Sequence, residues 1–462
     1  MYARFIAFVA AIGGFLFGFD LGMIGAANVY LKDQFRLDDA QLGLVTGSAV
    51  LGCILGPFLG AWLCDAVGRK TTMIAASVLL AVSAVVTAVP DFLPGMGAGS
   101  TILVFNVFRA IGGLGVGLCS IASPMYIAEV APPAKRGGLG LMYQLAIVVG
   151  HIIAPVIAYL VITLLPKTDG VAQIAWQQPW RWMFASETVC VLLFVSFVFR
   201  LPRSPRWLAE KGRDDEALDV LTRMEGSEYA GREMAEIRAS LQQGTGGWAE
   251  LFAPGMRYAL LIGILLAFFN NWTGWSVMGG YVPMLFEMSG LGDRAEAIRQ
   301  FALVYGMMGV MTVVSLVLMD RAGRRPLWLF ASLLMAAITC AAGLVFHFHL
   351  TGVIVLLVVI LCTVPHGIAL GGIPWLMMSE LFPTRIRAKA VSITTTFLWI
   401  TIFSGAYLFP ALTTASNGLV GSVGGVFWLF TVICIFSFLF GVFMMPETKG
   451  RTLEEIADSW KR

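Results

Sequence analysis

Charged residues are scarce in this chain. Asp, Glu, Lys and Arg make up 13% of its 462 residues and hydrophobic residues make up 58%, whereas an ordinary soluble domain carries about 25% charged residues. Most charges fall in short clusters, and long apolar runs lie between them. Since about 20 apolar residues in a helix cross the hydrocarbon core of a bilayer, this pattern predicts a polytopic membrane protein. It excludes a disordered chain and a nucleic-acid-binding protein, and the net charge of +3 favours no anionic partner.

Motifs that would indicate other classes of protein are missing as well. The seven cysteines lie in or at the ends of apolar runs without a Cys-X-X-Cys pair, so the sequence predicts neither a disulfide framework nor a metal site. No Walker A pattern occurs, which argues against an ATP-driven pump. No nucleophile–base or multi-histidine spacing occurs, so we expect neither an enzyme nor a bound cofactor. The run Gly112–Gly117 has the spacing of a dinucleotide loop, but no strand precedes it, which favours close helix packing instead.

The apolar runs predict an all-α protein with twelve transmembrane helices in two sets of six. A polar segment at 201–255 separates a first half at 1–200 from a second half at 256–445, and a tail follows at 446–462. Helix-patterned stretches within the polar segment, Asp214–Met224 and Glu233–Leu241, predict a small helical bundle there. The expected spanning helices are 5–28, 41–64, 72–90, 101–128, 139–165, 180–200, 256–285, 297–319, 326–348, 353–379, 389–412 and 424–445.

The distribution of Lys and Arg predicts the orientation of these helices. With both termini placed in the cytoplasm, 24 of the 31 basic residues fall in cytoplasmic segments and six fall outside, while Arg109 lies within a helix. Because basic residues concentrate on the cytoplasmic side of membrane proteins, both termini are expected in the cytoplasm. We expect the protein to reside in the cell membrane.

The two halves repeat one another. The stretch from Asp65 to Lys70 matches the stretch from Asp320 to Arg325 at an offset of 255 residues. The pair Glu129 and Arg136 has its counterpart in a second Glu and Arg at an offset of 251. Such a parallel duplication predicts two six-helix units related by an axis along the membrane normal, with a substrate site between them near the midplane. That architecture favours a transporter.

The repeated charges have two interpretations. They are either anchors that fix the topology, or carboxylates at helix ends that pair with arginines of neighbouring loops and hold the halves together on the cytoplasmic side. In the second interpretation, opening toward the cytoplasm breaks the set, so the set favours an outward-facing state. The candidate residues of this cytoplasmic gate are Asp65, Arg69, Glu129, Arg136, Asp320, Arg324, Glu380 and Arg387.

Four motifs carry a resemblance to a known family. They are Gly14–Asp20 (GFLFGFD), Pro124–Glu129 (PMYIAE), Ser204–Leu208 (SPRWL) and Pro446–Arg451 (PETKGR). In this order the sequence resembles the sugar porter family of the major facilitator superfamily over nearly its whole length. The resemblance implies the major facilitator fold and transport of a sugar-like solute.

Asp20 and Arg109 are charges expected within the membrane at similar depth. An isolated charge there costs about 2.5–3.5 kcal/mol on insertion scales, so a pair that faces a cavity is expected. The resemblance implies proton coupling, because proton-coupled sugar porters carry an Asp and an Arg at these positions. A static buried ion pair is the alternative. Glu187 lies several residues into its helix and could join this set or pair elsewhere.

The resemblance also implies a substrate site. Phe17, Gln144, Tyr281, Gly371 and Trp375 match the pattern of the family, which uses amides to bind hydroxyl groups and aromatic rings to stack on the sugar.

Other positions of that site depart from the family pattern. Two Asn replace the usual pair of Gln, Ser276 stands near an expected Asn, and an expected aromatic is Gly280. A Gln position in the helix expected at 389–412 is Leu398, and a second Gln position in the helix expected at 139–165 is His151. The remaining candidate substrate-binding residues are therefore Asn270, Asn271, Ser276, His151 and His366. For the two histidines, direct ligand contact and hydrogen bonding within the bundle are both open.

The sequence thus predicts a secondary active transporter that moves a sugar or sugar-like polyol by alternating access, as a proton symporter and a monomer in the lipid bilayer. A facilitative uniporter and a transporter of an organic acid or another small solute remain alternatives. A nutrient sensor that binds a ligand without transport is less expected, because only about 17 residues follow the last predicted helix.

Overall fold

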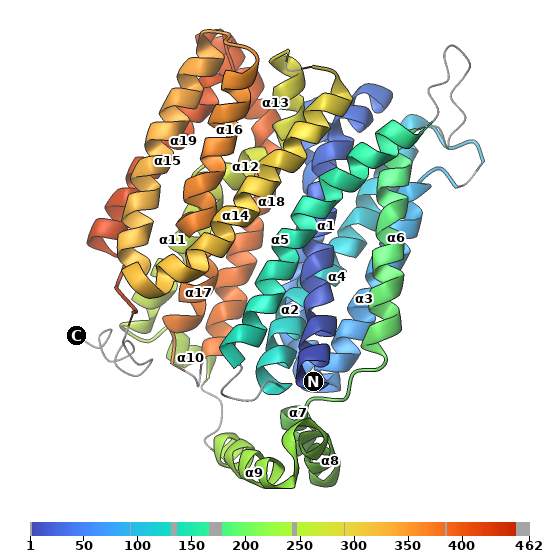
Figure 1. Ribbon diagram of the computed structural model, residues 1–462, viewed down its shortest axis with the longest axis vertical. Coiled ribbons are helices and arrows are strands. Elements are labelled where there is room, and N and C mark those ends of the chain that lie inside the picture. Colours follow the sequence, from blue (N-terminus) through green and yellow to red (C-terminus); the bar gives the residue numbers. More distant parts are fainter. Residues whose placement is uncertain are drawn as a thin grey trace.

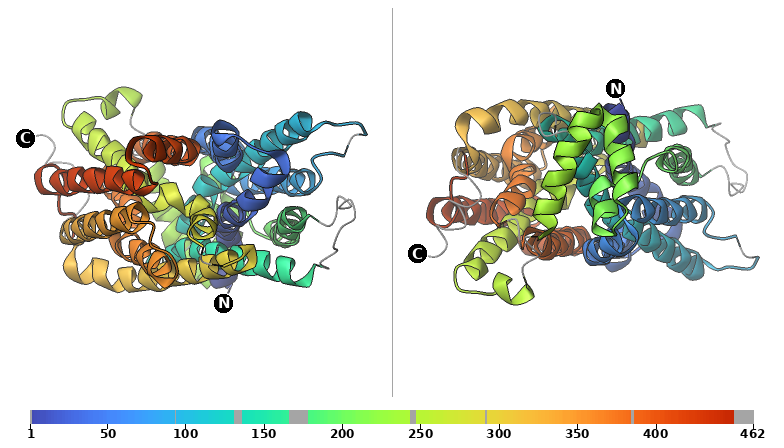
Figure 2. Two further views of the ribbon diagram at one scale, coloured as in Figure 1. Left: turned by 90° about the horizontal axis from the view of Figure 1, so that it is seen from above. Right: turned by 90° about the horizontal axis from the view of Figure 1, so that it is seen from below.

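The computed structural model describes residues 2–92, 94–130, 136–165, 178–242, 247–290, 292–383 and 386–449. Within these ranges the chain is helical and contains no β-strand. Two helical bundles stand side by side, the first formed by α1 to α6 and the second by the helices from α11 onward (Figure 1). The views along the bundle show the same division (Figure 2).

Six long helices form the first half. They are α1 (Tyr2–Phe35), α2 (Asp39–Val67), α3 (Arg69–Ala88), α4 (Ala98–Val130), α5 (Arg136–Leu164) and α6 (Pro179–Val198). The linker between the halves forms the short helices α7 (Pro205–Glu210), α8 (Asp214–Glu225), α9 (Ser227–Gln242) and α10 (Trp248–Leu251).

The second half contains more, and shorter, helical pieces. They are α11 (Met256–Trp272), α12 (Trp275–Met278), the 3₁₀ turn η3 (Gly279–Tyr281), α13 (Val282–Met288), α14 (Arg294–Ala322), α15 (Arg324–His347), α16 (Val353–Pro365), the π-turn η4 (His366–Leu370), α17 (Ile373–Glu380), α18 (Arg387–Val420) and α19 (Gly424–Phe443). Among the described residues, eleven helices are long and apolar enough to cross a membrane, and α11 with the bent segment after it makes a twelfth. The predicted all-α fold with twelve spans is confirmed.

Two helices that were expected to be regular are not: one is bent at a break, and the other crosses as a single span, Val353–Met378, that contains a π-turn. The helix expected at 256–285 bends by 50° between Trp272 and Trp275. Gly274 has a φ of +121° at this bend and lies against the ring of Phe430, a conformation that strains any residue with a Cβ. The helix expected at 353–379 is interrupted by η4, and α17 starts anew at Ile373. A membrane helix tolerates such breaks only where neighbouring helices satisfy the freed backbone groups.

Small residues bring helices of the first half into close contact. A Cβ on Gly113 of α4 would overlap the backbone of Ala49 in α2, and Gly117 lies directly against Gly56. The prediction that Gly112–Gly117 serves helix packing is therefore confirmed. Close backbone approach of this kind supports helix association in lipid.

The linker helices form a small bundle of their own at one end of the molecule (Figure 1). Their core contains Trp207, Leu208, Val220, Leu221 and Met234 among other apolar residues. The Nε1 group of Trp207 also donates a hydrogen bond of 3.2 Å to the backbone carbonyl of Asp65 at the end of α2. We refer to this end as the linker face and to the other end as the opposite face.

Polar contacts join the two halves at the opposite face. The Nδ2 group of Asn28 in α1 donates a hydrogen bond of 2.9 Å to the carbonyl of Gly280 in η3. Arg294, at the start of α14, forms an ion pair with Asp33 of α1, and its guanidinium lies 5.4 Å from the ring centre of Tyr30. These contacts close the opposite face between the first and second halves.

A second ion pair at the opposite face lies within the first half. Arg181 of α6 binds both carboxylate oxygens of Asp91, in the loop after α3, at 2.8 Å. These hydrogen bonds hold the pKa of Asp91 below its usual value. The pair fixes the α3–α4 loop to α6 without bridging the halves.

Substitution of Arg294 tests whether the contact between the halves stabilises this closed opposite face. An exposed ion pair contributes about 0.2–1 kcal/mol, so Arg294→Gln should shift the ratio of closed to open opposite face by up to about fivefold. Distances between spin labels at the opposite-face ends of α1 and α14 would measure this, in a variant whose native cysteines are replaced. Arg299→Gln is the matched control, because Arg299 pairs with Glu296 of its own helix. Equal distance distributions in Arg294→Gln and the control would contradict the expected role.

Candidate functional site

One cavity of about 570 Å³ lies between the two halves. Its lining comes from α1, α2, α4 and α5 on one side and from α11, α12, η3, α14, η4, α17 and α18 on the other. This volume falls in the range typical of small-molecule sites. All ten residues predicted to bind substrate line this cavity: Phe17, Gln144, His151, Asn270, Asn271, Ser276, Tyr281, His366, Gly371 and Trp375.

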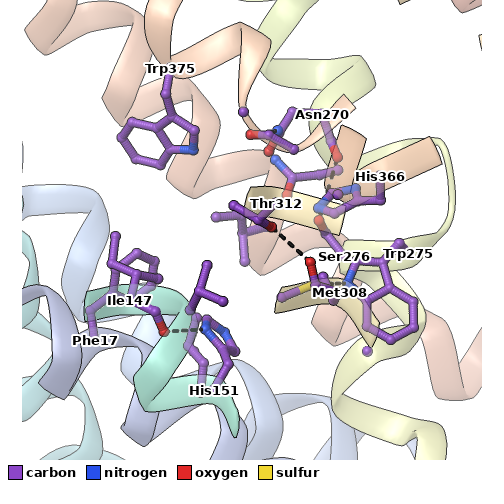
Figure 3. Close-up of a pocket in the computed structure, with 18 of the residues that line it drawn as sticks. Phe17, Ile147, His151, Asn270, Trp275, Ser276, Met308, Thr312, His366 and Trp375 are labelled. Atoms are coloured by element: carbon purple, nitrogen blue, oxygen red, sulfur yellow. Dashed lines mark hydrogen bonds between the residues drawn. The ribbon is translucent and has the colours of Figure 1, made fainter. Parts of the chain in front are cut away.

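The lining is neutral. Among the described residues that surround the cavity, no Asp, Glu, Lys or Arg occurs. The polar groups are hydroxyls, amides and two imidazoles, and the rest of the wall is aromatic or aliphatic. Figure 3 shows Phe17 and His151 facing Asn270, His366 and Trp375 across this space.

Aromatic rings connect the two halves along the wall of the cavity. The ring of Phe17 lies 5.1 Å from Trp399 of α18 and 6.3 Å from His151. The imidazole of His151 in turn lies 5.0 Å from the ring of Tyr305 in α14. Edge-to-face and tilted contacts at these distances are favourable between aromatic groups. The wall is therefore closely packed where α1 and α5 meet the second half.

The histidines differ in their hydrogen bonding. Nδ1 of His151 lies 3.0 Å from the carbonyl of Ile147, so a neutral His151 donates through Nδ1 and keeps Nε2 as an acceptor. Nδ1 of His366 is buried without a hydrogen-bond partner among the described protein atoms. Its ring lies 6.4 Å from that of Trp275. His366 thus contributes an unsatisfied polar atom beside the cavity.

The two asparagines use their amide nitrogens within the second half. Nδ2 of Asn270 donates to the carbonyls of Leu370 and Gly371 at 2.8 and 3.0 Å. Nδ2 of Asn271 donates to Thr401 Oγ1 of α18 at 2.8 Å and to a carbonyl one turn earlier at 3.1 Å. None of these four hydrogen bonds involves the side-chain oxygen of Asn270 or Asn271. Each amide therefore ties α11 to a neighbouring wall of the cavity.

Tyr281 and Ser276 are likewise held by the backbone. The hydroxyl of Tyr281 donates to the carbonyl of Ala406, and its ring stacks on Phe409 at 4.9 Å. Ser276 Oγ lies 3.4 Å from the carbonyl of Asn270, across the break that follows α11. These contacts fix the bent segment against α18 and against its own preceding helix.

One face of α14 belongs to the cavity wall and was missed by the sequence reasoning. The residues are Tyr305, Met308, Thr312, Ser315, Leu316 and Met319. They recur at spacings of three and four, and three of them carry a hydroxyl in an otherwise apolar run. That periodic polar face was the available signal. Leu398, which stands at a Gln position of the family pattern, is fully buried in a separate apolar cluster and does not line the cavity.

Asp20 and Arg109 form an ion pair between α1 and α4, as their predicted depth suggests. Both side chains are buried, and the Arg109 guanidinium lies 5.2 Å from the ring centre of Phe184. The expectation that the pair faces a cavity is not met, because neither residue lines the space described above. Nε and Nη2 of Arg109 have no hydrogen-bond partner among the described atoms. Glu187 of α6 is also buried and interacts electrostatically with both members of the pair.

The linker-face charges of the first half form one cluster. Arg69 binds Glu129 at 2.7 Å and lies 3.6 Å from Asp65. Glu129 also accepts a hydrogen bond from the hydroxyl of Ser204, at the start of the linker. The side chain of Arg136 lies outside the described residues. This cluster joins α2, α3 and α4 to the segment that leads into α7.

The second half repeats this cluster with equivalent groups. Arg324 binds Glu380 at 3.2 Å, and Glu380 accepts a hydrogen bond of 2.6 Å from Thr448. Glu447 caps the start of α15 by accepting from the backbone amides of residues 324 and 325 at 3.1 Å. Arg387 donates to the carbonyl of Phe382 at 3.3 Å. The side chain of Asp320 lies outside the described residues.

The ion pairs of both clusters therefore join elements of the same half. The expected pairing of these carboxylates across the two halves is not made by Arg69–Glu129 or by Arg324–Glu380 in this structure. The physical reason is proximity. In each half the carboxylate near the end of one helix lies beside an arginine at the start of another helix of the same half. Each cluster ties together the linker-face ends of one bundle.

Comparisons with known proteins agree with this architecture. The family model described as "Sugar (and other) transporter" matches residues 6–460. The arabinose-proton symporter of Bacillus subtilis (strain 168) is 37% identical over 98% of this chain and 94% of its own length. The D-xylose-proton symporter of Escherichia coli (strain K12) is 32% identical over 100% of this chain and 96% of its own length. A solved structure of the xylose transporter XylE from E. coli, in a partially occluded inward open conformation, matches with a TM-score of 0.84 and 30% identity, over 98% of this chain and 99% of that chain.

Glu380→Gln tests whether the linker-face clusters stabilise each half. The substitution leaves Arg324, whose side chain is 14% exposed, without its carboxylate partner. Unpaired buried polar groups cost about 1–3 kcal/mol, so the thermal unfolding midpoint of the purified protein should fall. Glu216→Gln is the control, because its pair with Arg213 is exposed on the linker bundle. A midpoint like that of the control would leave the cluster as an anchor of topology only.

Proposed function

This chain belongs to the family of sugar transporters, and we propose that it carries a neutral sugar or sugar-like polyol across the membrane together with a proton. The chain is an integral membrane transporter and not an enzyme. The observation that carries the proposal is the cavity between its halves, which holds all ten predicted binding residues and no charged side chain among those described.

The neutral lining favours a neutral solute over an organic acid. A carboxylate offers only hydrogen-bond acceptors and needs donors or a positive charge when it leaves water. Here the amide nitrogens of Asn270 and Asn271 already donate to the protein. Neutral His151 keeps an acceptor at Nε2. Such a wall matches the hydroxyl groups of a sugar or polyol, which can donate to these acceptors.

Recognition of the solute draws on both halves. Gln144 comes from α5 of the first half and Trp375 from α17 of the second. An indole ring can stack on the apolar face of a sugar ring, and an amide can exchange two hydrogen bonds with neighbouring hydroxyls. A solute that touches both residues binds the closed arrangement of the halves more tightly than the open one. Its differential affinity can then drive closure around it.

The position of the cavity and the contacts at the opposite face support a state that faces the cytoplasm. Most basic residues of the sequence fall in segments predicted to lie on the side of the linker, so the positive-inside rule supports a cytoplasmic location for the linker face and both termini. The cavity runs from the bundle centre toward that face, where Pro124, Met319 and Leu376 line it. At the opposite face Asn28 and Arg294 join the halves. This arrangement corresponds to an inward-facing transporter in the cell membrane, and a single chain suffices because it lines the cavity from both sides.

Asp20 is the proposed proton carrier. Its carboxylate is buried beside Arg109 within the membrane, with Glu187 close enough to interact with both. Intramembrane acids of this kind are characteristic of proton relays in transporters. Two relatives are proton symporters by name, which favours coupling over facilitated diffusion. A static ion pair in a uniporter is the second candidate.

Asp20→Asn distinguishes the two candidates. In proteoliposomes a pH gradient should no longer drive accumulation of labelled arabinose, xylose or glucose, while exchange of the same sugar across the membrane stays near the wild-type rate. Asp91→Asn is the control, since Asp91 also pairs with an arginine but at the opposite face. Wild-type accumulation in Asp20→Asn would assign the pair a purely structural role.

The solute is identified by a thermal-shift panel of pentoses, hexoses, polyols and sugar acids on the purified protein. For the neutral sugar that stabilises it, Gln144→Ala should weaken calorimetric binding by about 0.5–1.5 kcal/mol through loss of a hydrogen bond. Trp375→Ala should weaken binding at least as much through lost stacking. Trp62→Ala is the control, because Trp62 lies on the outer surface of the bundle and is 66% exposed. Unchanged affinity in both cavity variants, or stabilisation by the sugar acids alone, would overturn the proposed site.

A further inference from the structure

Both discontinuous helices of the second half break beside the cavity, and one side chain bridges the two breaks. Asn270 lies in the last turn of α11, just before the bend at Gly274. Its side chain reaches the second break, where the π-turn η4 passes into α17 at Leu370 and Gly371. Asn270 is 5% exposed, so this bridge is shielded from solvent.

The chemistry of the second break explains why a donor is needed there. Pro374 follows Leu370 by four residues and has no N–H group, so it cannot make the helical hydrogen bond to the carbonyl of Leu370. A carbonyl without a hydrogen-bond partner is unfavourable in the membrane interior. Nδ2 of Asn270 supplies the missing donor at 2.8 Å and also reaches the carbonyl of Gly371 at 3.0 Å. Both amide protons of Asn270 are then in use.

The first break is joined to the same residue. Ser276, on the far side of the bend, approaches the backbone carbonyl of Asn270 with its hydroxyl at 3.4 Å. The backbone carbonyl of Asn270 thus contacts the chain beyond the bend at Gly274. Its side chain contacts the other break, between η4 and α17. Trp375 lies one helical turn after Gly371, so the position of this indole depends on how the carbonyls of Leu370 and Gly371 are held.

We propose that Asn270 is a positioning residue, whose amide nitrogen clamps the η4–α17 break to the end of α11 and thereby places Trp375 in the cavity. The inference rests on the proposed function for the role of Trp375 as a ligand contact, but the clamp itself does not. A donor amide at this position serves the protein, and only Oδ1 is left for a solute. A glutamine is one methylene longer, so we expect Asn270→Gln to displace the amide nitrogen and to lose this pair of bonds.

The clamp is tested first without any ligand. Hydrogen–deuterium exchange of the purified protein should be faster at residues 371–376 in Asn270→Ala and Asn270→Gln than in wild type. Asn271→Ala is the matched control, because that neighbouring amide binds Thr401 and should affect α18 and not residues 371–376. Unchanged exchange at 371–376 in Asn270→Ala would overturn the clamp whatever the protein transports.

The link to Trp375 is tested by a double-mutant cycle with calorimetric titration of L-arabinose, D-xylose and D-glucose. Asn270→Ala should weaken binding of the sugar that binds wild type by about five- to tenfold. Trp375→Ala should weaken binding much less in the Asn270→Ala background than in wild type, because the indole is already misplaced. Gln144→Ala should keep its full effect in that background, since α5 belongs to the other half.

The two assays separate the possible failures. Full additivity of Asn270→Ala with Trp375→Ala, or wild-type affinity in Asn270→Gln, would show that Asn270 acts through direct contact with the solute and would overturn the positioning role. If none of the three sugars binds wild type while exchange at 371–376 responds as expected, the clamp stands and the proposed substrate class fails.

Discussion

The hydrocarbon core offers no hydrogen-bond partner, so each polar group inside this bundle must find one within the protein. That constraint explains why the broken helices lie where they do. The carbonyl of Leu370, freed by Pro374, is met by Asn270, and the charge of Asp20 is met by Arg109. Some buried polar atoms lack a protein partner among the described residues, and two of them, the hydroxyl of Tyr143 and Nδ1 of His366, belong to side chains that line the cavity.

The duplicated sequence produces two bodies that are each tied together at the linker face. Arg69 with Glu129 and Arg324 with Glu380 connect helix ends within one half, as equivalent groups in equivalent places. Polar contacts across the halves, such as that of Asn28 with Gly280, occur at the opposite face. The halves also pack on each other beside the cavity, where Phe17 meets Trp399 and His151 meets Tyr305. Two internally braced bodies that join through such an interface can rock about the space between them, which is the motion alternating access requires. A cluster that braces one half can persist through that motion, whereas a cluster that spans both halves would have to break.

Much of the cavity could be predicted because the resemblance to the sugar porter family implies which positions face the solute. All ten candidate residues line the space, including Ser276 and Gly371, whose types alone would not mark them. The face of α14 that carries Tyr305 and Thr312 was missed because a hydroxyl in an apolar helix does not by itself indicate a cavity. Such a group commonly bonds to the backbone of its own helix, as that of Thr312 does. The breaks at Gly274 and at η4 were missed because hydropathy is blind to backbone conformation, although Pro374 marks one of them. Pairing of the linker-face charges within each half was also beyond sequence reasoning, since it depends on which helix ends adjoin in space.

Separation of the ion pair from the cavity constrains how a proton and a neutral solute can be coupled. Phe17 and Leu21 line the cavity from α1, while Asp20, between them in sequence, is buried toward α4. The same helix therefore presents one face to the solute and another to the proton site. Direct contact between solute and carboxylate is absent in this arrangement, so under the proposed function coupling must pass through movement of α1. Protonation of Asp20 releases the charge attraction that holds α1 to Arg109, and closure around a solute displaces Phe17 on the other face. Because both events bias the position of one rigid helix, each can change the free energy of the other without sharing an atom.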